Sequence, residues 1–103
     1  MIKKATPATA PKVTASVEGR IMYSEPRTEV ILLNIQPGEE IPLHKNPFDV
    51  LFAGIEGKAK LLTPATTETI EAGETIFVTA EEERAWSNTE STPAKVLVIK
   101  ILL

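Results

Sequence analysis

His44 is the single histidine of a 103-residue chain that contains no cysteine. Asn46 and Asp49, which follow within five residues, offer further metal ligands. Zinc and iron are bound in proteins by several imidazole, thiolate or carboxylate groups, whereas an amide oxygen suits a hard cation. The residue types therefore allow a divalent metal on His44 and Asp49, but they do not make up an ordinary zinc or iron site.

Arg84 and Trp86 form a second group of residues with binding chemistry. A guanidinium stays protonated and cannot ligate a metal, but it binds carboxylates and phosphates with two parallel hydrogen bonds. Inside a cavity Arg84 would attract an acidic ligand. The alternative, which we favour, is an ion pair with Asp49 or a nearby glutamate. Trp86 lies two residues further on, on the same face of a strand, where a tryptophan either packs in the core or stacks on a ligand.

Strands must position these side chains, because no stretch of the chain shows the 3.6-residue periodicity of a helix. Apolar runs of four to eight residues recur between Gly, Pro and Asn, which is typical of an antiparallel sandwich or barrel. Alternation along a strand places His44 and Asn46 on one face, together with Phe52. Asp49 falls on the opposite face unless a bulge near Pro47 turns it inward, and both orientations stay open.

Gly38 is followed by five residues and then His44, and Gly57 lies six residues after Val50. This spacing resembles the first motif of the cupin superfamily, which runs G, five residues, H-x-H, three or four residues, E, six residues, G. Asn46 stands where that motif has its second histidine, and Val50 stands in place of the glutamate.

The second cupin motif is matched in the same partial way. Gly73 stands at its first position and Asn88 at its final asparagine, but Arg84 occupies the position of the histidine. The glycines that shape turns are therefore present, because positive φ angles favour glycine. Three of the four metal-binding positions are changed.

The resemblance implies an all-β fold, a double-stranded β-helix or jelly-roll cupin barrel. We expect residues 13–103 to form this single domain. Residues 1–12 are rich in Ala, Thr and Pro, and we expect a flexible or strand-exchanging arm there. The barrel cavity would bind a small molecule through the side chains at positions 44, 46, 52, 84 and 86, that is His44, Asn46, Phe52, Arg84 and Trp86.

Two strand segments, residues 30–35 and 95–103, are apolar at nearly every position, as in strands that are covered on both faces. The second cover in so small a protein is another subunit, so we expect a homodimer. The net charge of −3 without a Lys/Arg cluster argues against nucleic acid as a partner. No apolar run reaches the roughly 20 residues of a membrane helix, and no secretory signal is visible, so we expect a cytoplasmic protein.

The chemistry of the cavity stays open between classes of function. The first is binding of a small, acidic organic molecule without a tightly bound metal, so that no cofactor is expected. The second is a divalent-metal-dependent enzyme of isomerase or dioxygenase type that uses His44 and Asp49, or a metal-free enzyme with His44 as general base. The third is an interaction module in which the dimer surface matters more than the cavity. No residue can be assigned a catalytic role from the sequence, because cupin barrels host many reactions.

Overall fold

The computed structural model describes residues 1–103 and contains nine β-strands and no helix. No segment therefore forms a helix of the length and hydrophobicity needed to cross a membrane. The strands are β1 (Glu18–Glu25), β2 (Thr28–Ile35), β3 (Glu40–His44), β4 (Asp49–Glu56), β5 (Lys58–Leu62), β6 (Thr67–Glu71), β7 (Thr75–Val78), β8 (Arg84–Ser87) and β9 (Ala94–Ile101).

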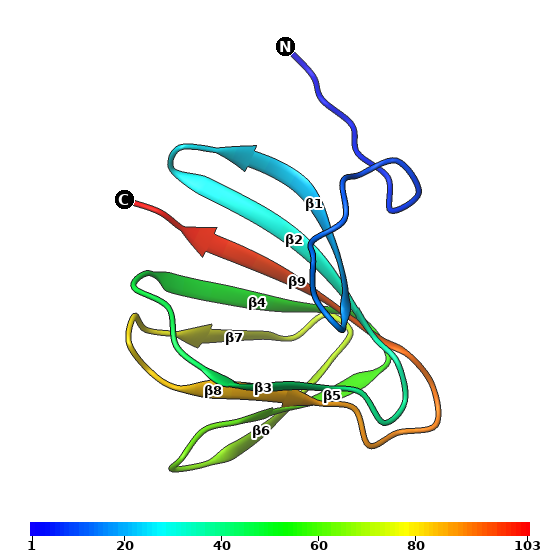
Figure 1. The fold of residues 1–103 in the computed structure, drawn as a ribbon, viewed down its shortest axis with the longest axis vertical. Helices are drawn as coiled ribbons and strands as arrows, with labels where there is room; N and C mark the ends of the chain where they lie inside the picture. The colour runs from blue at the N-terminus through cyan, green and yellow to red at the C-terminus, as the bar shows by residue number, and fades with distance from the viewer.

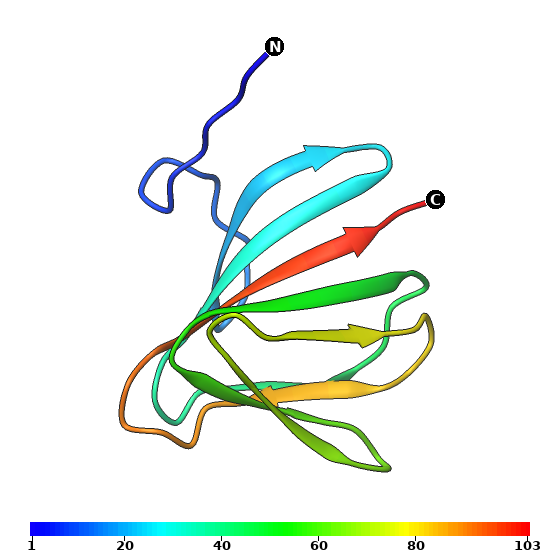
Figure 2. The ribbon, with the colours of Figure 1, turned by 180° about the vertical axis from the view of Figure 1, so that it is seen from behind.

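The strands form two antiparallel sheets that face each other (Figures 1 and 2). One sheet has five strands in the order β1-β2-β9-β4-β7, and the other has four in the order β3-β8-β5-β6. Neighbours in a sheet are mostly distant in sequence, as where β9 lies between β2 and β4. The all-β prediction is confirmed.

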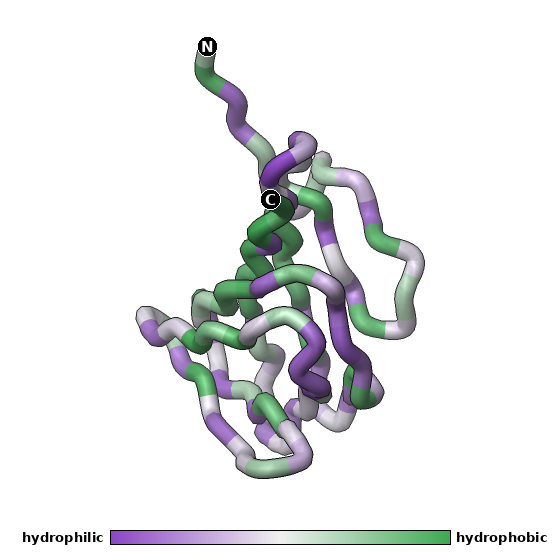
Figure 3. The backbone as a smooth tube through the Cα atoms, turned by 90° about the vertical axis from the view of Figure 1, so that its left-hand side faces the viewer, coloured by the Kyte–Doolittle hydropathy of each residue, from purple (hydrophilic) through white to green (hydrophobic).

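One hydrophobic core lies between the two sheets. Along β9 the inward residues Val96 and Val98 are buried, whereas the outward residues Leu97 and Ile99 remain partly exposed. The apolar run of β9 leads to the C-terminus and stands out as a hydrophobic segment (Figure 3). The 13 buried residues of the core are Val17, Ile31, Ile35, Val50, Phe52, Ala59, Leu61, Ile70, Val78, Trp86, Ala94, Val96 and Val98.

The predicted turn glycines adopt the conformations that their motif positions require. Gly38, Gly57 and Gly73 have φ angles of +83°, +69° and +87°. At Gly57, between β4 and β5, a Cβ atom would also lie only 2.3 Å from the carbonyl oxygen of Pro93. A side chain there would strain the backbone and collide with it.

The N-terminal arm is attached to the barrel of its own chain at its last residues. Ala10 is buried, the Ile21 N–H donates to the Pro11 carbonyl at 2.8 Å, and Arg20 Nη1 donates to the Ala10 carbonyl at 2.9 Å. The preceding residues extend away from the sheets (Figure 1). Exchange of this arm between subunits stays a prediction.

Candidate functional site

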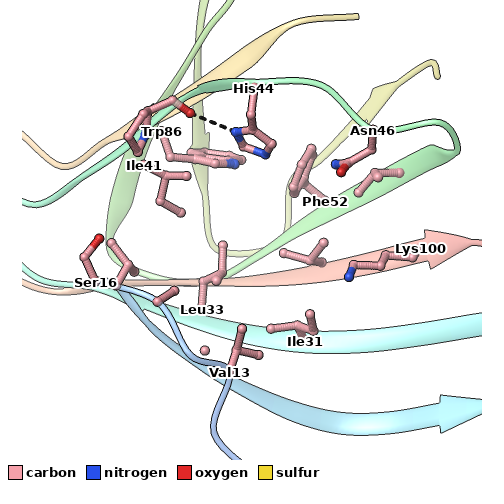
Figure 4. A pocket seen from close by; sticks show the side chains of 16 residues that line it. Val13, Ser16, Ile31, Leu33, Ile41, His44, Asn46, Phe52, Trp86 and Lys100 are labelled. Carbon is pink, nitrogen blue, oxygen red and sulfur yellow. Dashed lines mark hydrogen bonds between the residues drawn. The ribbon is translucent and has the colours of Figure 1, made fainter. Parts of the chain in front are cut away.

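A cavity of about 290 Å³ lies between the sheets, on the inner side of both (Figure 4). Ten of its 16 lining residues are hydrophobic, so the cavity is suited to an organic molecule with a few polar groups. The lining residues are Val13, Ala15, Ser16, Val17, Gly19, Ile31, Leu33, Ile41, Pro42, His44, Asn46, Val50, Phe52, Trp86, Val98 and Lys100.

His44 reaches the cavity through an irregularity in β3. Ile41 pairs with Trp86 and His44 pairs with Arg84, so three steps along β3 correspond to two along β8. The extra residue leaves Leu43 exposed and turns His44 to the inner side. His44 stays exposed itself and lies at the rim of the cavity.

One hydrogen bond indicates the tautomer of the neutral His44 ring, that is, which ring nitrogen carries the hydrogen. Its Nδ1 lies 2.8 Å from the carbonyl oxygen of Pro42, as the dashed line in Figure 4 marks. A carbonyl oxygen can only accept, so Nδ1 carries the hydrogen. In the neutral ring Nε2 then holds a lone pair, which is free to accept a proton or a hydrogen bond from a ligand.

Phe52 and Trp86 form the aromatic inner part of the cavity. Their ring centroids are 5.1 Å apart and the rings meet edge to face at 75°, which is a favourable aromatic geometry. Trp86 is buried, yet its Nε1–H has no hydrogen-bond partner. In Figure 4 its ring lies beside that of His44.

Arg84 lies inside the barrel but behind the lining of the cavity. Its side chain is 0% exposed and points to the same side of β8 as Trp86. Nη2 donates to the Thr79 carbonyl at 3.4 Å, while Nε and Nη1 have no partner. Burial lowers the pKa of Arg84, and the charge of Glu82 opposes this in part.

The predicted ion pair of Arg84 does not form, because none of the salt bridges in the structure includes it. Asp49 is engaged elsewhere: its Oδ1 accepts a hydrogen bond of 2.8 Å from the Ala80 backbone N–H. Asp49 borders a separate surface hollow beside Leu102 and Leu103. The structure therefore does not bring Asp49 together with His44, and no bulge after Pro47 turns it inward.

Four of the five predicted ligand-binding residues line the cavity, namely His44, Asn46, Phe52 and Trp86. Lys100, which was not predicted from the sequence, also lines the cavity. Lys100 Nζ donates to Glu29 Oε1 at 2.8 Å and lies 5.6 Å from the centre of the Phe48 ring. A signal was present, because Lys100 is the single charge in the apolar run of residues 96–103, on the same face as Val96 and Val98.

The geometry above is that of a double-stranded β-helix barrel with a cavity between its sheets. The model of the cupin domain family matches residues 31–100, and the chain belongs to this family. The prediction of a cupin jelly-roll barrel is therefore confirmed. No curated protein is found to be similar in sequence.

Solved structures share the fold at low sequence identity. The polyketide cyclase RemF from Streptomyces resistomycificus has a TM-score of 0.87 at 17% identity, covering 100% of this chain and 81% of RemF. An uncharacterised conserved protein with a double-stranded β-helix domain from Klebsiella pneumoniae has a TM-score of 0.84 at 13% identity, with 99% and 91% covered. The protein TT1209 from Thermus thermophilus has a TM-score of 0.83 at 18% identity, with 99% and 98% covered.

The metal site that cupin motifs imply does not fit the residues of this chain. No three His, Cys, Asp or Glu side chains come close enough together to hold a metal ion. Within the cavity the metal-ligating types are one imidazole, His44, and one amide, Asn46. Arg84, which pairs with His44 across the strands, adds a positive charge that repels a cation.

Proposed function

We propose that this cupin domain binds a small organic molecule in its barrel cavity, without a tightly bound metal. The observation that carries the proposal is the cavity of about 290 Å³, which is mostly apolar but holds the free Nε2 of His44. Apolar lining supplies the affinity for a hydrophobic ligand, and a few polar groups orient it. The donor set around His44 supports the absence of a resident metal.

Fluorescence of Trp86 tests this proposal, because it is the single tryptophan of the chain and lines the cavity. A library of small organic molecules is titrated against untagged protein whose metal content is measured by elemental analysis. Leu33→Phe fills the cavity and abolishes the fluorescence response, whereas Leu32→Phe, on the outer face of the same strand, leaves it unchanged. A full equivalent of bound metal, or equal binding by both variants, contradicts the proposal.

A metal-free enzymatic function is the second candidate, and the hydrogen bond from His44 Nδ1 to Pro42 favours it. The bond orients the ring and leaves Nε2 as a general base, which could remove a proton next to a carbonyl group. The RemF structure, described as a polyketide cyclase, shares this fold. The metal-dependent alternative on His44 and Asp49 has less support, since the two side chains line different hollows.

Hydrogen exchange distinguishes the enzyme from the binding protein. Acetophenone in D2O is followed by NMR, because its methyl hydrogens exchange only after a base removes one and a deuteron is returned from solvent. A general base at His44 accelerates the exchange, and His44→Gln removes the acceleration. The exchange rate is compared at a concentration at which acetophenone quenches Trp86 and is therefore bound. Equal rates with the natural chain and with His44→Gln would contradict the enzymatic function and support binding only.

We also propose that the chain forms a homodimer through the outer face of the five-stranded sheet. One row of this face runs across four strands through Val30, Ile99, Leu51 and Phe77. Phe77 is 54% exposed, and the others are only partly covered. A second copy of the same face would cover this row. Light scattering then gives a dimer for the natural chain and a monomer for Ile99→Lys, and a monomeric natural chain contradicts the proposal.

A further inference from the structure

The unsatisfied buried polar groups of this molecule gather on one face of one strand. The buried side-chain nitrogen or oxygen atoms without a hydrogen-bond partner are Arg84 Nε, Arg84 Nη1 and Trp86 Nε1. All three are hydrogen-bond donors, and both residues point to the inner side of β8. The interior of the barrel next to β8 therefore lacks hydrogen-bond acceptors for these three donors.

Such a group of donors is costly in a folded protein. An unpaired buried donor loses its bonds to water without replacement, and an unpaired buried cation is costlier still. Arg84 has one protein partner, the Thr79 carbonyl, at 3.4 Å, which is beyond the usual range of an N–H···O bond. A bound group that only accepts hydrogen bonds and carries negative charge would relieve this cost.

The cavity lies next to these donors. Arg84 is flanked by two residues that line the cavity, with His44 across from it on β3 and Trp86 two positions along β8. Its weak bond to Thr79 is the one hydrogen bond that holds the guanidinium in its present orientation. For Nε and Nη1 to reach the cavity, the guanidinium must turn toward His44.

We infer that the ligand of this cavity is an organic monocarboxylate whose carboxylate group accepts hydrogen bonds from Arg84 and Trp86. This inference rests on the proposed function and names its ligand class. The ring or chain of the acid lies against Phe52 and the apolar lining. A phosphate fits less well, because the second cation at the cavity, Lys100, is already paired with Glu29 at 2.8 Å.

Benzoate and benzamide are the matched probes, since they share size and ring and differ in charge. The 103-residue chain labelled with ¹⁵N gives one indole Nε1–H resonance, from Trp86, and Arg84 Nε–H is resolved among few arginine signals. Benzoate shifts both resonances saturably at neutral pH. Its dissociation constant is at least about tenfold lower than that of benzamide, as expected for a charge-assisted pair.

Arg84→Met removes the preference for benzoate over benzamide, while Arg27→Met, at an exposed arginine, keeps it. If Arg84→Met does not fold, the natural chain still decides, because bound benzoate slows the exchange of the Arg84 Nε–H with water. Equal affinity for benzoate and benzamide overturns the inference but leaves the proposed function standing. Inorganic phosphate that binds as tightly as benzoate has the same consequence. No response of Trp86 to benzoate overturns the inference, and no response to any member of the library overturns the proposed function as well.

Discussion

The two ends of β8 carry the two buried polar side chains of the protein, Arg84 and Asn88, and these are treated in opposite ways. Asn88, directly after the strand, donates from Nδ2 to the carbonyls of Ile35 and Thr92 at 2.8 and 2.9 Å. Its Oδ1 accepts from the Glu90 N–H at 2.9 Å. Arg84, equally buried, leaves two of its three nitrogens without a partner.

This contrast separates the part of the motif that specifies the fold from the part that specifies the site. Asn88 matches its position in the second cupin motif, and its three bonds tie the end of β8 to β2 and to the loop before β9. Arg84 departs from the motif, and its donors make a single long hydrogen bond to the barrel, at 3.4 Å to the Thr79 carbonyl. A side chain that holds the fold, as Asn88 does, is satisfied within the chain, whereas the open bonds of Arg84 are those that we infer a ligand completes.

The largest effect is expected from introducing the histidines of the cupin motifs at positions 46 and 84, so that a metal site forms with His44. The double variant Asn46→His/Arg84→His places three imidazoles around one point together with His44, which is a ligand set that zinc accepts. Micromolar affinity would correspond to about 8 kcal/mol. Elemental analysis after dialysis with zinc gives close to one equivalent for the double variant and almost none for the natural chain. Equal zinc content would show that these three side chains do not converge.

Asn88→Ala is expected to have the next largest effect, because Asn88 is the buried polar side chain whose hydrogen bonds are all made within the chain. The change removes three hydrogen bonds and leaves buried backbone groups unpaired, which costs about 2 to 4 kcal/mol of unfolding free energy. Urea unfolding measures this as a lower midpoint at an unchanged slope. The control Asn34→Ala removes a partly exposed side chain and changes stability by less than about 0.5 kcal/mol. Equal effects of the two variants would contradict a structural role for Asn88.

Arg84→Met is expected to act in the opposite direction at the other end of the strand. Replacing an unpaired buried charge by an apolar side chain of similar length is neutral or raises the unfolding free energy, by about 1 kcal/mol. Arg20→Met serves as the control, because that arginine is bonded to Glu18 and to the Ala10 carbonyl and its loss is slightly destabilising. A loss of about 2 kcal/mol or more on Arg84→Met would show that Arg84 supports the fold as Asn88 does, and the contrast would not hold.

The fold could be predicted from the sequence because its signals are local. Gly38, Gly57 and Gly73 mark turns whose φ angles depend on each residue alone, and apolar runs of strand length mark the strands. Alternation correctly predicted that His44 and Asn46 share the cavity, although β3 ends at His44 and its irregularity between Ile41 and His44 sets the orientation of that ring.

The site could be predicted only in part, because two of its features depend on tertiary structure. The sequence does not show that Arg84 turns behind the lining, since a long side chain can reach in several directions from one position. The orientation of Asp49 is equally open in the sequence, and it is the Ala80 N–H, 31 residues away, that fixes its carboxylate outside the cavity. Lys100 was not predicted, because the apolar residues around it in β9 indicate a subunit interface as readily as a cavity.

The smallest effect is expected at Lys100, a cation that lines the cavity and, unlike Arg84, has a charged partner. The hydrogen bond from Lys100 lowers the pKa of Glu29 below its usual 4.5, while burial opposes this in part. The unfolded state therefore binds more protons in this range, so the stabilisation is complete above pH 4.5 and is lost as the pH falls through the lower folded pKa. For a partly exposed pair the loss is less than about 1 kcal/mol.

Urea unfolding between neutral pH and the acid range below the ordinary pKa of glutamate measures this loss. Lys100→Met abolishes the part of the acid dependence that Glu29 contributes, whereas Lys95→Met changes little, because the Lys95–Glu56 pair is longer, at 3.9 Å, and more exposed. An unchanged acid dependence in Lys100→Met would mean that Glu29 does not hold this lysine. Lys100 would then be a second free cation at the cavity, and the choice of a carboxylate could no longer be attributed to Arg84 and Trp86 alone.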